Sequence, residues 1–177
     1  MRTDIAGDEA ISYEVIDSPY GQLLLAASTR GLVKIGLDEA DFDAELAALS
    51  RTFEVNPVRD SRPLQSTIGQ LEEYFAGQRQ VFDLSLDHRL ASGFRQTVQQ
   101  ALADIPYGET ASYGEVAADV GRPRASRAVG TACATNPLPL VLPCHRVVRS
   151  DGSVGHYGGG PAMKVALLDL EKRNRAA

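Results

Sequence analysis

The first part of the chain alternates hydrophobic and polar positions with the two-residue period of β-strands. Residues 11–15 alternate in this way, and a Ser-Pro-Tyr-Gly turn signal follows at 18–21. Two further apolar runs, 23–27 and 32–37, are separated by a short segment that ends in glycine. The pattern predicts a three-stranded antiparallel meander.

The period then lengthens to that of a helix. Apolar residues recur at helical spacing from Phe42 to Leu49 and again from Leu64 to Phe75, just before Gly77. Residues 55–63 read as a connection between two helices, and the alternation in 81–86 predicts one more short strand. Residues 1–90 are therefore expected to form a small α+β domain with an antiparallel sheet and no chemistry of its own.

From Ser92 onward the pattern predicts helices and turns. A first helix covers Phe94 to Leu102, and a second is opened by Ser112, with Glu115 three residues later as in a capping box. A third, rich in Ala and Gly, covers about 125–134 after a short Arg-Pro-Arg turn. Two short helices joined by a tight turn are typical of a helix-turn-helix, although any two packed helices give this pattern.

The end of the chain predicts a small wing and a last helix. A turn at 150–153 is expected to join strands at 146–148 and 154–157 into a hairpin. Glycines 158–160 form a flexible link or let a substrate approach backbone amides. In a helix over 162–173, Val165 and residues 166–168 should face the core.

The fold class expected from these elements is α+β with two domains. The small N-terminal α/β domain spans 1–90, and a C-terminal helical domain of winged helix-turn-helix type spans 91–177. A chain of 177 residues with 44% hydrophobic content can build such cores. The opening MRTDIAGDEA has no signal-peptide pattern, and no apolar run approaches a membrane span, so the cytoplasm is the expected location.

Charge is distributed unevenly. Residues 1–100 carry a net charge of −7, whereas residues 101–177 carry +2, within an overall −5. Five arginines (122, 124, 127, 146 and 149) lie between Asp119 and Asp151 with no acid among them. This run indicates either a phosphate-binding footprint or an ordinary solvated basic face.

Cys144 is the candidate for reactive chemistry. It lies between Pro143 and His145, and the proline stiffens the backbone that presents the thiol. Most free cysteines merely pack in a core, so neighbouring motifs must support the catalytic interpretation. The two cysteines and three histidines lack metal-ligand spacing, so neither a metal nor another cofactor is expected.

Several short motifs lie in order along the second half of the chain: Ile105-Pro-Tyr-Gly-Glu-Thr110, Ser112-Tyr113, Arg127-Ala128-Val129-Gly130, Asn136-Pro137, Pro143-Cys-His-Arg-Val-Val148, and the downstream Gly155, Tyr157 and Gly159-Gly160. Together they resemble the motifs of one family, the O6-alkylguanine-DNA alkyltransferases, also called methylated-DNA–protein-cysteine methyltransferases. The resemblance runs without a gap from about Phe94 to Glu171. It implies a suicide DNA repair protein that transfers an alkyl group from guanine O6 to Cys144, and it leaves O4-alkylthymine open as a second substrate.

The resemblance also implies the catalytic roles. His145 would act on Cys144 through a bound water, and Glu171 on the last helix would orient His145. Tyr113 would help to rotate the nucleotide and protonate the leaving guanine. A free thiol is only a few per cent thiolate at neutral pH, which is why such activation is required.

DNA contacts and a base pocket follow from the same resemblance. Double-stranded DNA with alkylated bases is the expected partner, bound by a monomer, with cooperative loading along DNA left open. The DNA-binding positions it implies are Tyr113, Arg124, Arg127 as the intercalating residue, Ala128 and the hinge Asn136. The pocket positions are Cys133, Pro139, Val147, Gly155, Tyr157 and Gly158.

Some features depart from the family pattern, and other functions compete. Gln99 stands where many relatives have tryptophan, and Cys133 is either a small apolar wall or a redox partner of Cys144. The competing functions are a non-catalytic protein that binds alkylated DNA, a winged-helix regulator and a Cys-His hydrolase. Non-catalytic relatives replace the cysteine, which this chain retains at Cys144, and a regulator would not require the Pro-Cys-His-Arg corner.

Overall fold

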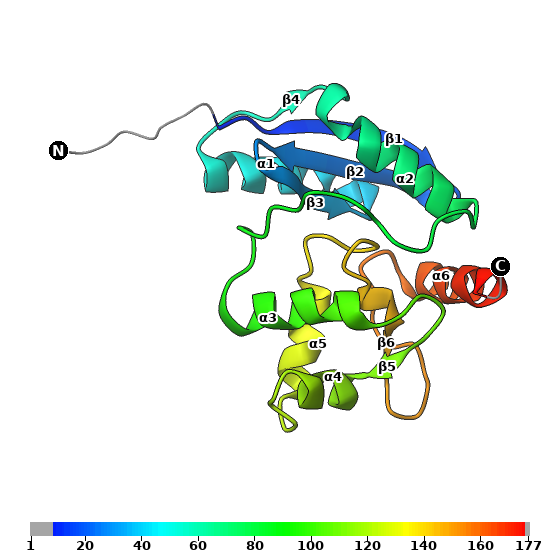
Figure 1. The fold of residues 1–177 in the computed structure, drawn as a ribbon. Coiled ribbons are helices and arrows are strands. Elements are labelled where there is room, and N and C mark those ends of the chain that lie inside the picture. Colours follow the sequence, from blue (N-terminus) through cyan, green and yellow to red (C-terminus); the bar gives the residue numbers. More distant parts are fainter. Residues whose placement is uncertain (1–8, 176–177) are drawn as a thin grey trace.

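A computed structural model describes residues 9–175 of the chain, in two parts that lie one above the other (Figure 1). The opening residues 1–8, on which the expected absence of a signal peptide partly depended, lie outside the described range. The first part contains the strands β1 (Ser12–Ser18), β2 (Gly21–Ser28), β3 (Gly31–Gly36) and β4 (Val58–Arg59) and the helices α1 (Phe42–Phe53) and α2 (Gln65–Phe75). The α+β class predicted from the sequence is confirmed.

The sheet has the strand order β3-β2-β1-β4. The predicted meander is confirmed, since β1, β2 and β3 pair antiparallel. The sheet is nevertheless mixed, because β4 pairs parallel to β1 within the segment expected to be a mere connection. Val58 N donates to Ile11 O at 2.9 Å, and Asp60 N donates to Tyr13 O at 3.0 Å. A two-residue edge strand is too short to leave a periodic signal.

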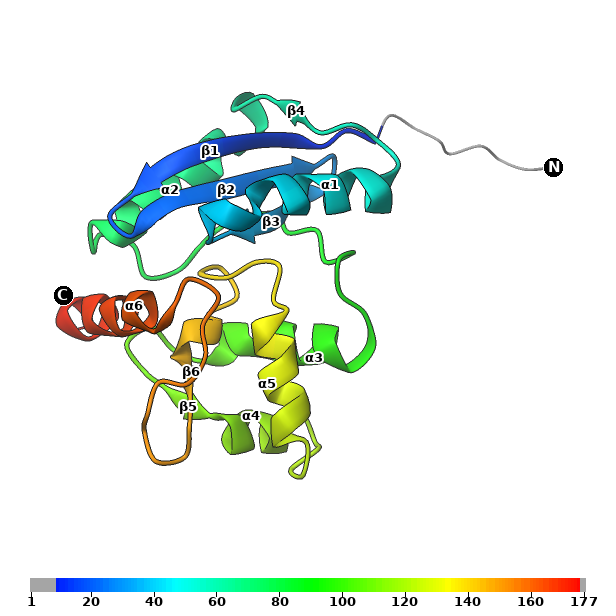
Figure 2. The same cartoon turned by 180° about the vertical axis from the view of Figure 1, so that it is seen from behind.

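The two helices of this part cover opposite faces of the sheet (Figures 1 and 2). Leu23 and Leu25 on one face of β2 belong to the large core that also contains Leu71 of α2. Ala26 on the other face packs in a smaller core with Leu49 of α1. Successive side chains of a strand point to opposite faces, so one strand contributes to both cores.

The strand predicted at 81–86 is wrong. The chain there makes a single isolated bridge between Leu86 and Leu32, with Leu32 N donating to Ser85 O at 2.9 Å. Gly31 explains how the backbones come so close, because a Cβ at this position would lie 2.3 Å from the Ser85 carbonyl oxygen. The alternating pattern thus marks a segment that touches the sheet at one point.

The second part is helical, as predicted. It contains α3 (Gly93–Ala101), β5 (Ala111–Ser112), α4 (Tyr113–Asp119), α5 (Ser126–Ala134), β6 (Val147–Val148) and α6 (Pro161–Asn174). The predicted capping box is confirmed: Glu115 N donates to Ser112 Oγ at 3.1 Å, and Ser112 N donates to Glu115 Oε2 at 2.7 Å. Buried Gln99 ties α3 to α5, since its Nε2 donates to Ala132 O at 3.0 Å.

The expected wing hairpin is only partly present. The turn forms, with Arg149 N donating to Ser153 O at 2.9 Å, but no strand follows it at 154–157. β6 instead pairs parallel with β5, from which it is separated by more than thirty positions in sequence. The sequence pattern predicted pairing with the adjacent segment 154–157, whereas β6 pairs with β5, which precedes α4.

One core assignment on α6 also needs correction. Val165 is 43% exposed, whereas Lys164 and Glu171, which look like surface residues in the sequence, are fully buried. Leu167 is buried as expected. Two charged residues, which are not paired with each other, therefore occupy positions on the inner face of α6 where the sequence pattern predicted Val165. Within residues 9–175, no helix combines the length and apolar character that crossing a bilayer requires.

Candidate active site

Cys144 begins a short 3-10 turn, Cys144–Arg146, that leads directly into β6. The thiol residue is 5% exposed, and His145 is fully buried. Asn136, itself buried, holds the approach to this turn. Its Nδ2 donates to Leu142 O at 2.8 Å, and its Oδ1 accepts from Leu138 N at 3.0 Å. The loop between α5 and the cysteine is therefore fixed at both ends by one amide side chain.

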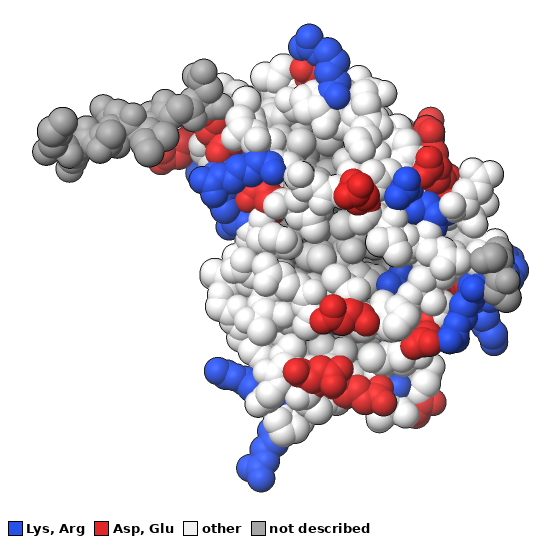
Figure 3. Space-filling view, in the orientation of Figure 1, with Lys and Arg blue, Asp and Glu red and all other residues white. Residues whose placement is uncertain are grey.

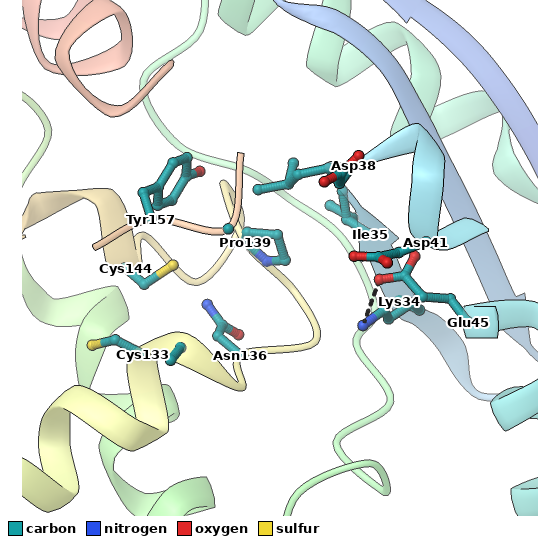
Figure 4. Close-up of a pocket in the computed structure, with 13 residues that line it drawn as sticks. Lys34, Ile35, Asp38, Asp41, Glu45, Cys133, Asn136, Pro139, Cys144 and Tyr157 are labelled. Carbon is teal, nitrogen blue, oxygen red and sulfur yellow. Dashed lines mark ion pairs between the residues drawn. The ribbon is translucent and has the colours of Figure 1, made fainter. Parts of the chain in front are cut away.

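A cavity of about 160 Å³ opens beside the thiol (Figure 4). Its lining from the second part of the chain is Cys133, Ala134, Asn136, Pro139, Cys144, Tyr157 and Gly158. Its lining from the first part is Lys34, Ile35, Leu37, Asp38, Asp41 and Glu45. Lys34 and Glu45 form an ion pair at 3.2 Å across from the thiol. The cavity is thus shared between the two parts, and its far wall carries three acidic residues, of which Glu45 is paired with Lys34.

Behind the thiol lies a buried charged cluster centred on Glu171. Its Oε1 lies 2.7 Å from His145 Nε2 and accepts from the Tyr74 hydroxyl at 2.7 Å. Arg146 Nε donates to Oε2 at 2.9 Å, and the Gly108 amide donates to the same oxygen at 3.2 Å. Arg146 also donates to the Ile105 carbonyl at 2.6 Å. Every charge in the cluster is matched by a neighbour, as burial requires.

The cluster sets the protonation states around the histidine. Burial alone would raise the pKa of Glu171, but hydrogen bonds from His145 and Arg146 outweigh it and hold the pKa at about 2. Burial lowers the pKa of His145, although Glu171 acts in the opposite direction. A neutral His145 facing an ionised Glu171 must carry its proton on Nε2. Its Nδ1, which is buried and has no hydrogen-bond partner among the described residues, is then a free acceptor.

Both cysteines are poor acids in the resting protein. Burial raises the pKa of Cys144, and a hydrogen bond from Asn136 and the charge of Lys164 offset part of this rise. Burial raises the pKa of Cys133 to about 12. Because Cys144 has a base in the adjacent residue and Cys133 does not, the chemical difference between the two thiols comes from their neighbours.

Tyr113 lies at the start of α4, next to the segment that follows the wing turn. A Cβ at Gly155 would lie 3.1 Å from the Tyr113 hydroxyl, and one at Gly130 would lie 3.9 Å from the Tyr113 ring. Gly155 also has φ +72°, which favours glycine. The two glycines therefore leave room for the ring between α5 and this segment.

Of the predicted DNA-contact residues, Arg124, Arg127 and Ala128 are exposed, whereas Tyr113 is half-buried and Asn136 is buried. Arg127 and Ala128 lie in the first turns of α5, and Arg124 lies in the turn before it. Basic side chains project from the end of the molecule where α4 and this turn lie, beside a group of acidic ones (Figure 3). Asp104, Glu109, Glu115 and Asp119 line an acidic groove there. The footprint of five arginines predicted from the sequence needs correction, because Arg146 is buried and paired with Glu171, which leaves Arg122, Arg124, Arg127 and Arg149 exposed.

The structure brings most of the predicted site residues together. Six of them, Cys133, Asn136, Pro139, Cys144, Tyr157 and Gly158, line one cavity, and His145 joins Glu171 behind it. Val147, Gly155 and Tyr113 lie outside the cavity lining, and Arg127, Arg124 and Ala128 lie on an exposed surface. Sequence reasoning missed Tyr74, Lys164 and the acidic wall, because none of them belongs to a local motif. No group of three or more His, Cys, Asp or Glu side chains in residues 9–175 is arranged to hold a metal.

Two family models together match nearly the whole chain. Residues 11–88 match the ribonuclease-like domain of 6-O-methylguanine DNA methyltransferase, and residues 93–173 match the DNA-binding domain of the same family. A Mycobacterium bovis protein named methylated-DNA–protein-cysteine methyltransferase is 42% identical over 167 residues, covering 94% of this chain and 96% of the relative.

Solved structures agree in fold as well as sequence. The crystal structure of Mycobacterium tuberculosis O6-methylguanine methyltransferase superposes with a TM-score of 0.80 at 42% identity, covering 93% of this chain and 94% of that one. The structure of Mycobacterium tuberculosis OGT in complex with DNA gives 0.81 at 41% identity, covering 92% and 94%. The chain therefore belongs to the 6-O-methylguanine DNA methyltransferase family, the direct-reversal repair enzymes that transfer an alkyl group from DNA to a protein cysteine.

Proposed function

We propose that Cys144 is the cysteine that accepts the alkyl group from O6-alkylguanine in duplex DNA. Its thiolate attacks the alkyl carbon in line, so that an S–C bond forms while the C–O6 bond breaks and its electron pair stays on guanine. The thioether product has no ready route back, and each chain reacts once. The observation that carries this proposal is the position of Cys144 between an open cavity and the buried His145–Glu171 pair.

His145 takes the thiol proton in this scheme. Its Nδ1 is the free acceptor, and a water bridges it to the sulfur as the family resemblance implies. Glu171 holds the tautomer, because its Oε1 lies 2.7 Å from Nε2. Glu171 also stabilises the imidazolium formed when the proton arrives. Arg146 keeps Glu171 ionised, and it therefore acts on Cys144 indirectly, through Glu171 and His145.

The target nucleotide reaches the thiol by leaving the helix, which costs a few kcal/mol of stacking. Arg127 enters the vacated stack from the minor groove, and Arg124 and Ala128 lie against the DNA backbone beside it. Tyr113 helps to rotate the nucleotide, and its hydroxyl gives the leaving guanine a proton. The exposure of α5 and the packing of Tyr113 against Gly130 and Gly155 support these roles.

The base pocket is formed around the same cavity. Pro139 and Tyr157 wall it, and the Gly158 amide and the Cys144 and Val147 carbonyls read the base edge. Asn136 couples the end of α5 to this pocket through its two backbone hydrogen bonds. Cys133 contributes a small side chain to the wall, in keeping with its raised pKa. O4-alkylthymine presents the same kind of alkyl–oxygen bond and is a second substrate class.

The chain acts as a monomer on duplex DNA that contains alkylated bases, and it does so in the cytoplasm. Cooperative binding of several chains along DNA would be measured by the steepness of the binding isotherm. No cofactor takes part, because the thiol and the substrate supply every electron of the transfer. The division into 1–90 and 91–177 is proposed from the composition change at this point, and the family models meet between residues 88 and 93.

Intact-mass analysis after incubation with an O6-methylguanine oligonucleotide tests the proposal. We expect one added methyl group per chain, located on Cys144, and none in Cys144→Ala. Cys133→Ala is the matched control and should still be labelled. Repeated turnover would indicate a hydrolase, and tight binding of the lesion without labelling would indicate a non-catalytic binder. Either result would remove the transfer role from Cys144.

A further inference from the structure

Lys164 is a fully buried lysine that the proposed reaction does not use. Its Nζ donates to the Val147 carbonyl at 2.6 Å and lies 3.4 Å from the His156 carbonyl. Within residues 9–175, it forms no ion pair with a carboxylate. A buried charge without a counter-ion is unfavourable. The buried ammonium group of Lys164 would therefore be stabilised by an anion that forms during the reaction and is absent in the resting protein.

The ammonium group lies where three parts of the site meet. Val147 belongs to β6, three residues after the thiol, and His156 precedes the pocket residues Tyr157 and Gly158. The Nζ atom is also 5.9 Å from the centroid of the Tyr113 ring. Lys164 on α6 thus contacts both the strand that follows the cysteine and the segment that leads into the pocket residues Tyr157 and Gly158.

The balance of charge around Cys144 makes this position informative. The titratable and charged groups that face the thiol region are Cys133, His145, Arg146, Arg149, Tyr113, Tyr157, Lys164 and Glu171, with Lys34, Asp38, Asp41 and Glu45 across the cavity. Arg146 is already matched to Glu171, and Lys34 to Glu45. Asp38 and Asp41 disfavour a thiolate. Lys164 and Arg149 have no such partner among the described residues, but Arg149 is exposed to solvent, so buried Lys164 is the unmatched positive charge that acts on the sulfur.

The coupling of the two groups acts in both directions. The charge of Lys164 lowers the pKa of Cys144 against the effect of burial. Burial lowers the pKa of Lys164, and the thiols Cys144 and Cys133 raise it in return. A thiolate formed at Cys144 and the ammonium of Lys164 would each supply what the other lacks in a site that excludes water.

We propose that Lys164 is a positioning residue of the alkyl-transfer site, which holds β6 against the 156–158 segment and stabilises the Cys144 thiolate before attack. The inference rests on Cys144 as the acceptor. The thiol proton passes to His145, Lys164 keeps its own protons throughout, and the S–C bond then forms as the C–O6 bond breaks. Lys164 therefore acts on the fraction of thiolate and on no atom of the substrate.

The pH dependence of Cys144 alkylation separates the charge of Lys164 from its hydrogen bonds. Lys164→Gln keeps N–H donors without the charge, Lys164→Met removes both, and Lys164→Arg keeps the charge. Exposed Lys172 on the same helix supplies the control Lys172→Met. All are made in a Cys133→Ser background, so that iodoacetamide meets one thiol. The reagent forms an S–C bond with loss of iodide, and peptide mass spectrometry follows Cys144 between about pH 5 and 10.

We expect the Gln and Met variants to raise the apparent pKa of Cys144 by about one unit, which lowers labelling at neutral pH about tenfold. Lys164→Arg and Lys172→Met should stay within about threefold of the parent. A Gln profile that coincides with the parent profile would reduce Lys164 to a structural clamp and overturn the proposal.

A measurement on the unsubstituted chain keeps the proposal testable if a variant fails to fold. Two coupled groups shift each other's pKa, so S-methylation of Cys144 should lower the pKa of Lys164. NMR of 13C-labelled lysine side chains measures this pKa before and after methylation. An unchanged Lys164 pKa would also overturn the proposal. Failure of the proposed function looks different: the parent would react with iodoacetamide yet take no alkyl group from DNA.

Discussion

The two parts of the molecule treat buried charge in opposite ways. The first part buries one charged residue, Asp87, among the residues that the structure describes. The second part buries three, Arg146, Lys164 and Glu171, together with the neutral His145. Both parts contribute apolar residues to one large shared core, and the first part has a second, smaller one, so the contrast is one of polar chemistry and not of hydrophobic content.

The surroundings of these charges show what the difference means. Asp87 accepts from the Ser28 hydroxyl at 2.5 Å and from Arg89, whose side chain reaches the surface. It thereby ties β2 to the segment that leads into α3. Glu171 instead accepts from donors on α2, the 3-10 turn and the loop before β5, and all of them surround the reactive corner. The first part uses a buried charge to fix a connection, whereas the second concentrates charge where the proposed mechanism transfers a proton.

Glu171→Gln should break this contrast with the largest effect. A neutral amide at this position could not balance Arg146, and removal of one partner from a buried pair typically costs about 3–5 kcal/mol of unfolding free energy. Transfer from DNA to Cys144 should fall by more than about a hundredfold, because the His145 tautomer and imidazolium lose their support. Urea unfolding and single-turnover kinetics measure the two effects.

Asp87→Asn is the matched change in the first part. It should lower stability while leaving the rate of transfer within about twofold of the parent. If Asp87→Asn slowed transfer as much as Glu171→Gln, both effects would reflect loss of fold and the contrast between the two parts would fail.

Arg127→Ala should lower repair of duplex DNA by about ten- to a hundredfold while sparing reaction with free O6-benzylguanine. An extruded base leaves an unstacked gap worth a few kcal/mol, and Arg127 is the proposed residue that fills it. The free base needs no extrusion. Rates of Cys144 labelling by the two substrates measure the ratio, and equal losses on both would remove the intercalating role from Arg127.

Acid should destabilise the protein mainly through the buried cluster. The folded pKa of Glu171, about 2, lies below its unfolded value of about 4.3, so its contribution is complete above that value and is lost as the pH falls toward 2. The shift corresponds to roughly 3 kcal/mol. The lowered pKa of His145 acts with the same sign, because the unfolded chain binds that proton first as the pH falls below about 6.5.

Unfolding free energy measured between about pH 7 and 3 tests this dependence. The parent should lose stability progressively across this range, and Glu171→Gln should show a flatter curve. Asp87 also has a pKa of about 2, since bonds from Arg89 and Ser28 outweigh its burial. An unchanged slope in Glu171→Gln together with a flattened slope in Asp87→Asn would move the acid sensitivity to the first part.

The sequence predicted those features that leave local signals. Capping at Ser112, the apolar spacing of α1 and α2 and the Pro-Cys-His corner all lie within a few residues of one another, and all are present. The strand predicted at 81–86 is wrong, and the wing forms its turn but not its second strand, because strand pairing depends on distant partners. β6 pairs with Ala111–Ser112 and not with the adjacent segment 154–157. Leu86 forms its bridge with Leu32, which lies more than fifty residues earlier in the chain.

The candidate site divides in the same way. The family resemblance implied that Glu171 orients His145, and the two side chains are in contact at 2.7 Å. The inner position of Lys164 and the exposure of Val165 follow from a charged cluster that no hydrophobic pattern records. Tyr74 lies on α2, in the part expected to have no chemistry, yet its hydroxyl donates to Glu171.

Tyr74→Phe should therefore show how much the first part contributes to the reaction, with the smallest effect of the series. The lost hydroxyl donates to Glu171 at 2.7 Å and lies 3.4 Å from His145 Nε2. A hydrogen bond to a charged group is worth about 1.5–3 kcal/mol, so stability should fall by that amount and transfer by several fold.

Tyr107→Phe is the matched control, because the buried Tyr107 hydroxyl has no partner among the described residues. Removing an unpaired hydroxyl should leave stability unchanged or slightly higher. Thermal unfolding and single-turnover labelling of Cys144 compare the two variants, and equal losses in both would mean that the aromatic packing at 6.3 Å between these rings matters more than the hydrogen bond.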